Sequence, residues 1–152
     1  CIRDRTGAVH DDGAPRITGA GEIADTAELA PTASALALLA SGPTRLTGIG
    51  HLRGHETDRL AALTAEAARL GITVDEDETS LGFPGTDASG PLSPAALETY
   101  HDHRMATFAA VVGLRVPGTG IVDVATTAKT MPDFPALWTA LVAPGDAAEE
   151  AR

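Results

Sequence analysis

The order of apolar patterns along the chain recurs, and this recurrence most restricts the folds that the chain can adopt. From residue 21 onward the patterns predict a strand, a helix, a strand, a helix and two strands, followed by much of the same order again. A unit that returns after roughly 60 to 70 residues is typical of a repeat architecture. Because each unit can cover one face of a small sheet with helices, we expect a compact α/β (α+β) body.

The first predicted unit spans residues 21–90. Its clearest element is residues 56–70, where apolar side chains share one helical face and Gly71 supplies a typical helix stop. Alternating patterns predict the strands. The elements expected after an initial strand are a helix over 32–40, a strand over 44–49, a helix over 56–70 and a two-strand hairpin over 72–75 and 79–83.

The second predicted unit spans residues 91–146 and is incomplete, because no convincing closing pair of strands follows it. Its expected elements are a helix over 103–114, a strand over 119–125 and a helix over 135–142. We expect residues 1–20 to form an edge strand or loops, residues 147–152 to form a frayed tail, and all four segments to belong to one partial domain. The unpaired edges and the missing initiator Met indicate a piece of a longer chain.

Composition narrows the class of protein and its partners. The formal net charge is −10, and such a surface repels nucleic acid and anionic membranes. No apolar run reaches the ~18 residues that span a bilayer, and the amino terminus lacks a secretory signal. The single Cys forms no intramolecular disulfide. We therefore expect a cytoplasmic protein without nucleic-acid or membrane partners.

Three short segments concentrate residues that could carry chemistry, namely 55–59, 101–104 and 127–130. The first two place Arg59 and Arg104 in the first turns of predicted helices, where free backbone N–H groups favour anions. Arginine also binds carboxylates and phosphates through two parallel hydrogen bonds. These segments, together with the one lysine of the chain, predict an anion site on an otherwise acidic protein.

Other interpretations of these segments stay open at this point. An arginine in a first helical turn is usually solvated, or forms a surface ion pair of small energy. The histidines at positions 51, 55, 101 and 103 invite a metal site, but the chain has no HExxH motif and no paired cysteines. Glycine-rich nucleotide loops and a G-x-S-x-G elbow are absent as well. We therefore expect no metal.

The sequence resembles a known family in three segments: HETDRLAALTAEAARLG, YHDHRMATFAAVVGLRVPG and TTAKTMPDFPALW. They are similar, in order and spacing, to the carboxyl-terminal motifs of 5-enolpyruvylshikimate-3-phosphate synthases, over roughly residues 22–142. The resemblance implies a fold of two similar domains built from βαβαββ units. It also implies transfer of the enolpyruvyl group of phosphoenolpyruvate to the 5-hydroxyl of shikimate-3-phosphate, with release of phosphate. Members need no metal or organic cofactor and are usually soluble monomers.

The resemblance assigns roles around phosphoenolpyruvate. Arg59 and Arg104 match the arginines that clamp its carboxylate, and Lys129 matches the lysine at its phosphate side. Glu56 matches the carboxylate that moves the proton at the methylene carbon, with His103 beside it in a supporting role. A carboxylate there is chemically useful, because protonation of that carbon creates an oxocarbenium-like centre.

Further positions depart from the family pattern. Glu28 stands where most members have an aspartate that receives the 5-hydroxyl proton. His55 stands where many members have a lysine that faces shikimate-3-phosphate, and His51 stands where many have an asparagine. Asp102 follows the family pattern and is expected to open a helix and orient its neighbours. The implied catalytic residues are Glu28, Glu56, His103 and Lys129. The implied substrate-binding residues are Glu28, His51, His55, Arg59, Arg104 and Lys129.

Several family motifs for shikimate-3-phosphate and phosphate are absent from this chain. We therefore expect it to have negligible transferase activity alone, and a non-catalytic or degenerate fragment of the same fold remains the alternative. UDP-N-acetylglucosamine enolpyruvyl transferases share the fold and the donor but lack the DHRM and AKTxPDF pair. RNA 3′-terminal phosphate cyclases use similar units, but the acidic composition argues against them.

Overall fold

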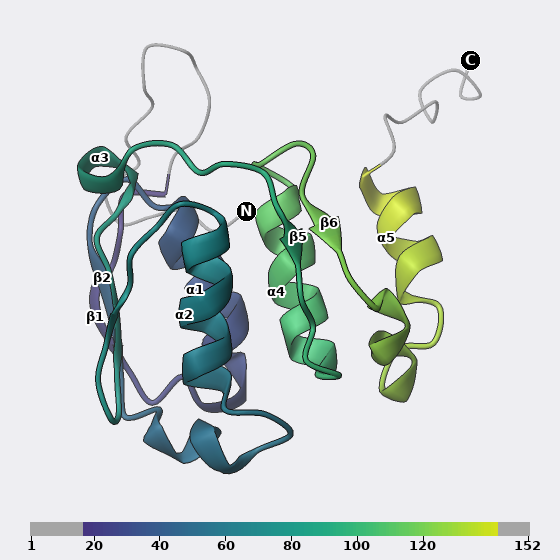
Figure 1. Cartoon of the computed structure of the whole chain (residues 1–152), viewed down its shortest axis with the longest axis horizontal. Helices are drawn as coiled ribbons and strands as arrows, with labels where there is room; N and C mark the ends of the chain where they lie inside the picture. Colours follow the sequence, from purple (N-terminus) through teal and green to yellow (C-terminus); the bar gives the residue numbers. More distant parts are fainter. Residues whose placement is uncertain (1–16, 143–152) are drawn as a thin grey trace, which may run out of the picture.

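A computed structural model describes residues 17–142 of the chain (Figure 1). The predicted order of elements in the first unit is confirmed. Its strands and longer helices are β1 (Gly21–Ala24), α1 (Ala30–Leu39), β2 (Thr44–Thr47), α2 (Arg59–Arg69), β3 (Asp75–Glu76) and β4 (Leu81–Phe83). The short helical segments between and after them are η1 (Ala27–Leu29), η2 (Gly50–Gly54) and α3 (Thr86–Ser89).

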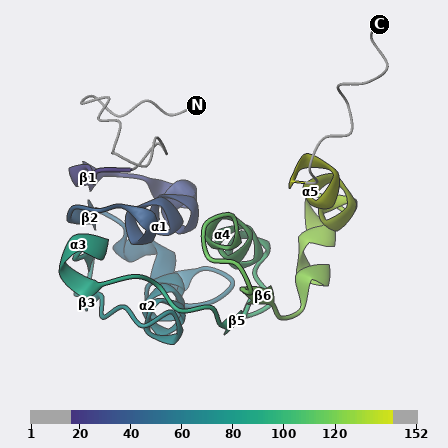
Figure 2. The ribbon, with the colours of Figure 1, turned by 90° about the horizontal axis from the view of Figure 1, so that it is seen from above.

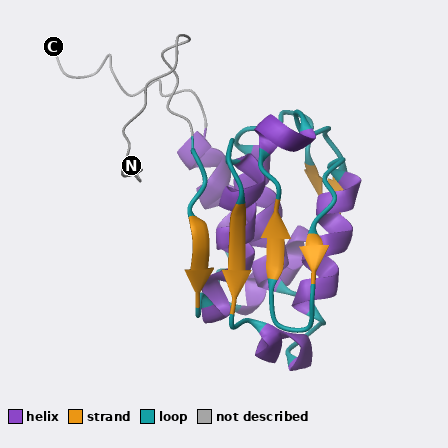
Figure 3. Cartoon of the chain, turned by 90° about the vertical axis from the view of Figure 1, so that its left-hand side faces the viewer, coloured by secondary structure: helices purple, strands orange, loops and turns teal. Residues whose placement is uncertain are grey.

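These strands form one four-stranded sheet in the order β1-β2-β4-β3 (Figure 3). β1 and β2 are parallel, because α1 carries the chain back between them, whereas β2, β4 and β3 are antiparallel neighbours. Alternate residues of β2 and β4 are buried, so only one face of the sheet enters the core. Figures 2 and 3 show the helices gathered on that face.

The core lies between this sheet and three helices. Leu46 and Leu81 of the sheet are fully buried, as are Leu63 of α2 and Phe108 of the later helix α4 (His103–Gly113). α1 is apolar around its whole circumference and packs extensively against α4. A helix of this kind must be covered on several sides, which explains its place between the sheet and α4.

The second part of the described chain contains a smaller sheet than the first. It contains β5 (Ala96–Leu97), α4, β6 (Gly120–Ile121), η3 (Val124–Lys129) and α5 (Phe134–Val142). β5 and β6 form a separate two-stranded parallel sheet. The incompleteness of the second unit stays a prediction, because α5 ends at the last described residue.

Several predicted elements are shorter than expected. The hairpin strands predicted over 72–75 and 79–83 are limited to β3 and β4. The strand predicted over 119–125 is limited to β6, because Asp123 adopts a left-handed conformation (φ 56°) and η3 follows it. The strand predicted over 44–49 ends at Thr47, since Gly48 turns the chain with φ 71°. The helix predicted from residue 56 begins at Arg59, because the Asp58 side chain accepts a hydrogen bond from Ala61 N at 3.0 Å.

The predicted terminal segments fall largely outside the residues that the structure describes. Most of residues 1–20 and the whole tail 147–152 lie outside the described residues, and residues 17–20 are not in a strand. The boundary between the units at residues 90 and 91 stays a prediction. Among residues 17–142, no helix combines the length and the apolar character needed to cross a lipid bilayer.

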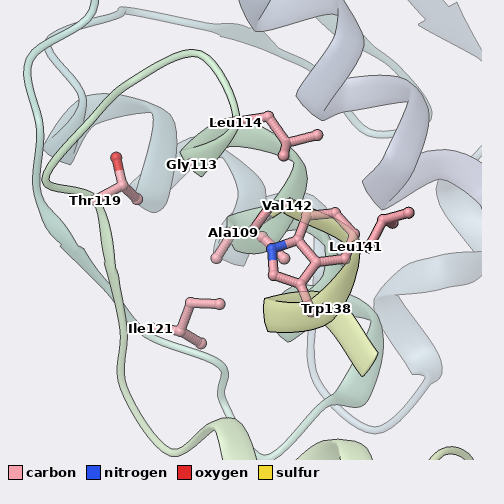
Figure 4. A pocket seen from close by; sticks show the side chains of 9 residues that line it. Ala109, Gly113, Leu114, Thr119, Ile121, Trp138, Leu141 and Val142 are labelled. Atoms are coloured by element: carbon pink, nitrogen blue, oxygen red, sulfur yellow. The ribbon is translucent and has the colours of Figure 1, made fainter. Parts of the chain in front are cut away.

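α5 stands apart from the rest of the helices, as the views in Figures 1 and 2 agree. Phe134 is its one buried residue, and its ring stacks on Trp138 with a centroid distance of 5.5 Å. An open groove of about 730 Å³ separates α5 from α4, with Trp138, Leu141 and Ile121 in its lining (Figure 4). Leu137 and Leu141 are exposed, so α5 lacks the cover that an apolar helix requires.

Candidate functional site

The candidate site lies where α1, α2 and α4 begin, at the lower end of the molecule in Figure 1. Aspartates cap two of these helices. Asp58 precedes α2, and Asp102 precedes α4, where its Oδ1 accepts a hydrogen bond from Arg104 N at 2.8 Å. Arg59 follows its cap Asp58 by one residue, and Arg104 follows Asp102 by two. Both arginines therefore lie in the first turns of their helices, as the sequence predicts.

Arg59 lies at the centre of the site and is nearly inaccessible, with 2% of its side chain exposed. Its Nε donates to Asp102 Oδ2 at 2.6 Å, and its Nη1 donates to Glu28 Oε2 at 2.7 Å. Asp102 is fully buried. The interpretation of this arginine as a solvated surface residue is therefore wrong, because two carboxylates draw it into the interior.

Arg104 approaches the same glutamate from α4. Its Nη1 donates to the backbone oxygen of Glu28 at 2.8 Å. Its Nε lies 2.8 Å from Glu28 Oε2, an ion pair that lacks the alignment of a hydrogen bond. Glu28, held in η1 just before α1, thus joins the two arginines across the site.

Two histidines flank Glu28. His55 Nδ1 lies 3.3 Å from Glu28 Oε1, and the His51 and His55 rings meet edge to face with centroids 6.0 Å apart. Burial acts to raise the pKa of Glu28, but the hydrogen bond from Arg59 and the charges of Arg59, Arg104 and His55 outweigh it and lower the pKa. Glu28 is therefore held as a carboxylate.

A second cluster lies beside the first and is more open to solvent. η3 brings Lys129 onto Glu56, where Nζ contacts Oε1. His103 Nδ1 lies 3.7 Å from Glu56 Oε2 and 3.9 Å from Asp102 Oδ1, and it is buried without a hydrogen-bond partner. A small rotation of either side chain would let the imidazole and the Glu56 carboxylate share a proton.

Glu56, Asp102 and His103 each place one potential metal-ligand atom within 4.8 Å of the others. Two cations already lie on these carboxylates, because Arg59 pairs with Asp102 and Lys129 pairs with Glu56. A divalent ion at this point would have to displace Lys129, and the expectation of a site without metal stays a prediction.

The arrangement suits an anion with two separated charges. Arg59, Arg104 and Lys129 gather at one place on an acidic chain, as expected, and three carboxylates balance them: Glu28, Glu56 and Asp102. Because Glu28 and Glu56 are partly exposed, an incoming carboxylate or phosphate can take their place on the cations. A carboxylate and an imidazole then remain nearby for proton transfer.

The structure brings all the predicted site residues into one contiguous region, while their chemical roles stay predictions. Two features were missed. The direct ion pair between Asp102 and Arg59 joins residues 43 positions apart, which no local pattern reveals. Glu66, a fully buried carboxylate in α2, also escaped notice, although its place on the apolar stripe between Leu63 and Leu70 was a usable signal.

The chain as a whole is similar to proteins of one known family. Residues 7–138 match the family model described as EPSP synthase (3-phosphoshikimate 1-carboxyvinyltransferase). Proteins named 3-phosphoshikimate 1-carboxyvinyltransferase from Kocuria rhizophila and Mycobacterium ulcerans are 54% and 49% identical over 121 and 123 residues. Each alignment covers 80% of this chain but only 26% and 28% of the relative. The chain thus spans about a quarter of the length of these curated relatives.

Solved structures are similar as well. Two structures of EPSP synthase from Acinetobacter baumannii superpose with TM-scores of 0.64 and 0.60, at 31% and 29% sequence identity. Each covers 70% of this chain, and this chain covers 25% and 24% of the respective structure. In sequence and in structure, the similarity thus covers about a quarter of the related protein.

Proposed function

Because this chain belongs to the EPSP synthase family, we propose that it supplies one side of the active site of an enolpyruvyl transferase. The reaction moves the enolpyruvyl group of phosphoenolpyruvate to the 5-hydroxyl of shikimate-3-phosphate and releases phosphate. It would serve the shikimate pathway to chorismate and the aromatic amino acids. We place the enzyme in the cytoplasm, as a monomer that acts without metal or organic cofactor.

One observation carries the proposal: Arg59 and Arg104 converge on a single carboxylate oxygen, Glu28 Oε2, at 2.7 and 2.8 Å. Two arginines that share one carboxylate in this way can equally hold the carboxylate of phosphoenolpyruvate. Asp102 keeps Arg59 in place from behind, so that the guanidinium does not have to be ordered when the substrate arrives.

Lys129 and Glu56 would serve the other end of phosphoenolpyruvate. When a phosphate draws the Lys129 ammonium away, the Glu56 carboxylate can take up a proton from solvent and, as a carboxylic acid, give it to the methylene carbon. The adjacent carbon then carries positive character and forms its bond with the 5-oxygen of shikimate-3-phosphate. Return of a proton from the methyl group to Glu56 accompanies departure of phosphate, so His103 beside Glu56 is placed to support both transfers.

Glu28 would have two successive partners. In the unliganded structure its carboxylate lies on Arg59 and Arg104, where the carboxylate of the donor is expected to bind. Once displaced, it can accept the proton of the 5-hydroxyl as the new bond forms. His55 contacts Glu28, and His51 contacts His55, so both would face shikimate-3-phosphate.

The experiment is reconstitution. The chain is mixed with the separately expressed amino-terminal remainder of the Kocuria rhizophila relative, and phosphate release is measured with both substrates. We expect no turnover by either piece alone and turnover by the mixture. Lys129→Ala and Arg104→Ala should each abolish it, whereas Arg115→Ala, which removes an exposed arginine on the turn after α4, should not.

A non-catalytic role for the same fold is the second candidate, and the limited coverage of the relatives favours it. Failure to observe turnover, when both pieces are folded and associated, would move the chain to this class. Turnover that persists in Lys129→Ala and Arg104→Ala would instead show that these residues do not form the active site.

A further inference from the structure

Glu66 is a buried carboxylate that no step of the proposed reaction uses. It lies in α2 with no exposed surface and accepts three hydrogen bonds or ion contacts. Its Oε1 receives the Tyr100 hydroxyl at 2.6 Å and lies 3.3 Å from Arg69 Nε, while its Oε2 receives Glu98 N at 3.0 Å. A charge in the interior is costly unless donors of this kind surround it.

Two of these three donors belong to the segment that leads into the candidate site. Directly after Glu98 and Thr99, Tyr100 and His101 both adopt left-handed backbone conformations, with φ of 53° and 58°. Such conformations are unfavourable for residues other than glycine and persist only where the surroundings impose them. Asp102 is the next residue, so this strained turn determines where its carboxylate lies.

Few other contacts hold the turn. Asp102 N donates to Thr99 O at 2.8 Å, which closes the turn itself. His101 Nδ1 lies 3.1 Å from Asp123 Oδ2, but the His101 side chain is exposed. The Tyr100 ring packs against the hydrophobic core, and its hydroxyl on Glu66 is the one described side-chain hydrogen bond that joins the two strained residues to the helices.

We propose that Glu66 is a positioning residue, which holds the strained turn through Tyr100 and thereby aims Asp102 at Arg59 and at the first turn of α4. It would touch no substrate. The inference that this positioning serves catalysis rests on the proposed function, whereas the mechanical link between Glu66 and Asp102 does not.

The chemistry of the pair fits a permanent link. Burial, the hydrogen bond to Glu66 and the charge of Glu66 raise the pKa of Tyr100 to about 12, so its hydroxyl remains a donor throughout the physiological range. Arg69 touches the same Glu66 oxygen from the surface, with half of its side chain exposed. It offers a matched control, because its removal changes the charge near Glu66 but leaves the Tyr100 contact intact.

The test follows hydrogen exchange by NMR in the full 152-residue chain, at Arg59 Nε–H and Arg104 N–H, the two donors to Asp102. Tyr100→Phe removes only the hydroxyl. We expect it to reduce protection roughly tenfold at these two groups and less than about twofold at Leu46 N in the sheet. Arg69→Gln should leave all three within about twofold.

The outcomes separate positioning from general stability. Val74→Ala lowers the stability of the core away from the turn, so it should reduce protection uniformly. A uniform loss in Tyr100→Phe would overturn the proposal, as would unchanged protection at Arg59 and Arg104, or an unprotected Arg59 Nε–H in the unsubstituted chain. Glu66→Gln keeps an acceptor for Tyr100 without the charge, and should give an intermediate local loss.

Titration of the same samples with phosphoenolpyruvate tests the proposed function separately. Binding should shift the Arg59 and Arg104 guanidinium signals, and Tyr100→Phe should weaken it several-fold. The unsubstituted chain could show protected Arg59 and Arg104 groups but no shift of the guanidinium signals at millimolar phosphoenolpyruvate. In that case the candidate site is not an anion site, while the positioning role of Glu66 stands.

Discussion

The two halves of the candidate site use the same kinds of charge at very different depths. Arg59 is 2% exposed and lies between two carboxylates, one of them, Asp102, fully buried. Lys129 is 62% exposed and pairs with a single carboxylate, Glu56. One cluster of ions thus contains a buried part, which packs into the fold, and an exposed part, which is free to exchange its partners.

The most damaging change should be Arg59→Met. It leaves Asp102 buried without its cation, and breaking a buried ion pair from one side costs about 3 to 5 kcal/mol. Urea denaturation of the chain measures the free energy of unfolding, with the exposed Arg115→Met as the matched control. A decrease of less than about 1 kcal/mol in the free energy of unfolding would show that the Arg59–Asp102 ion pair contributes little to stability.

Asp102→Asn should cost less, because the amide oxygen can still cap α4 at Arg104 N. It removes the charge that Arg59 Nε contacts, and a hydrogen bond between charged groups contributes about 1.5 to 3 kcal/mol. Asp102→Ala also removes the cap and should add about 1 kcal/mol to that loss. Equal unfolding free energies for the two variants would mean that the cap contributes nothing.

Glu28→Gln changes the partly exposed carboxylate on Arg59 and Arg104, and it should affect both phosphoenolpyruvate binding and the acid dependence of stability. Removing the competing carboxylate should tighten phosphoenolpyruvate binding by up to about fivefold, since a part-exposed ion pair contributes at most about 1 kcal/mol. Calorimetric titration measures this affinity. Weaker binding would indicate that Glu28 orders the arginines instead of competing with the donor.

The pH dependence of the same variant follows from the lowered pKa of Glu28. The stabilisation by this carboxylate is present above the ordinary pKa of 4.5 and is lost as pH falls through the lower folded value. The original chain should therefore lose more stability than Glu28→Gln over that acid window. Denaturation curves that fall in parallel would refute the shift.

The smallest change in stability should come from Lys129→Met. An exposed ion pair contributes less than about 1 kcal/mol, so the unfolding free energy should barely move, although reconstituted turnover should disappear. A destabilisation comparable with that of Arg59→Met would erase the distinction between the two halves.

Local patterns predict much of this site, and they fail where distant segments meet. Arg59 and Arg104 were placed in first helical turns because caps and apolar stripes are written in consecutive residues. The burial of Arg59 was not predictable, since it depends on Asp102, which lies 43 positions away in the sequence. The shortened strand at residues 119–125 has a local cause, because the backbone of Asp123 departs from the extended form that its apolar neighbours favour.

Asp102 has a consequence for how this protein can change over generations. One of its oxygens caps a helix and the other holds a buried guanidinium. Asparagine preserves the first task and not the second, whereas glutamate keeps the charge but is a poorer cap. No single replacement serves both, so drift at this position has no neutral path, and variation selected for new specificity must enter through surrounding residues such as Glu28 or His55.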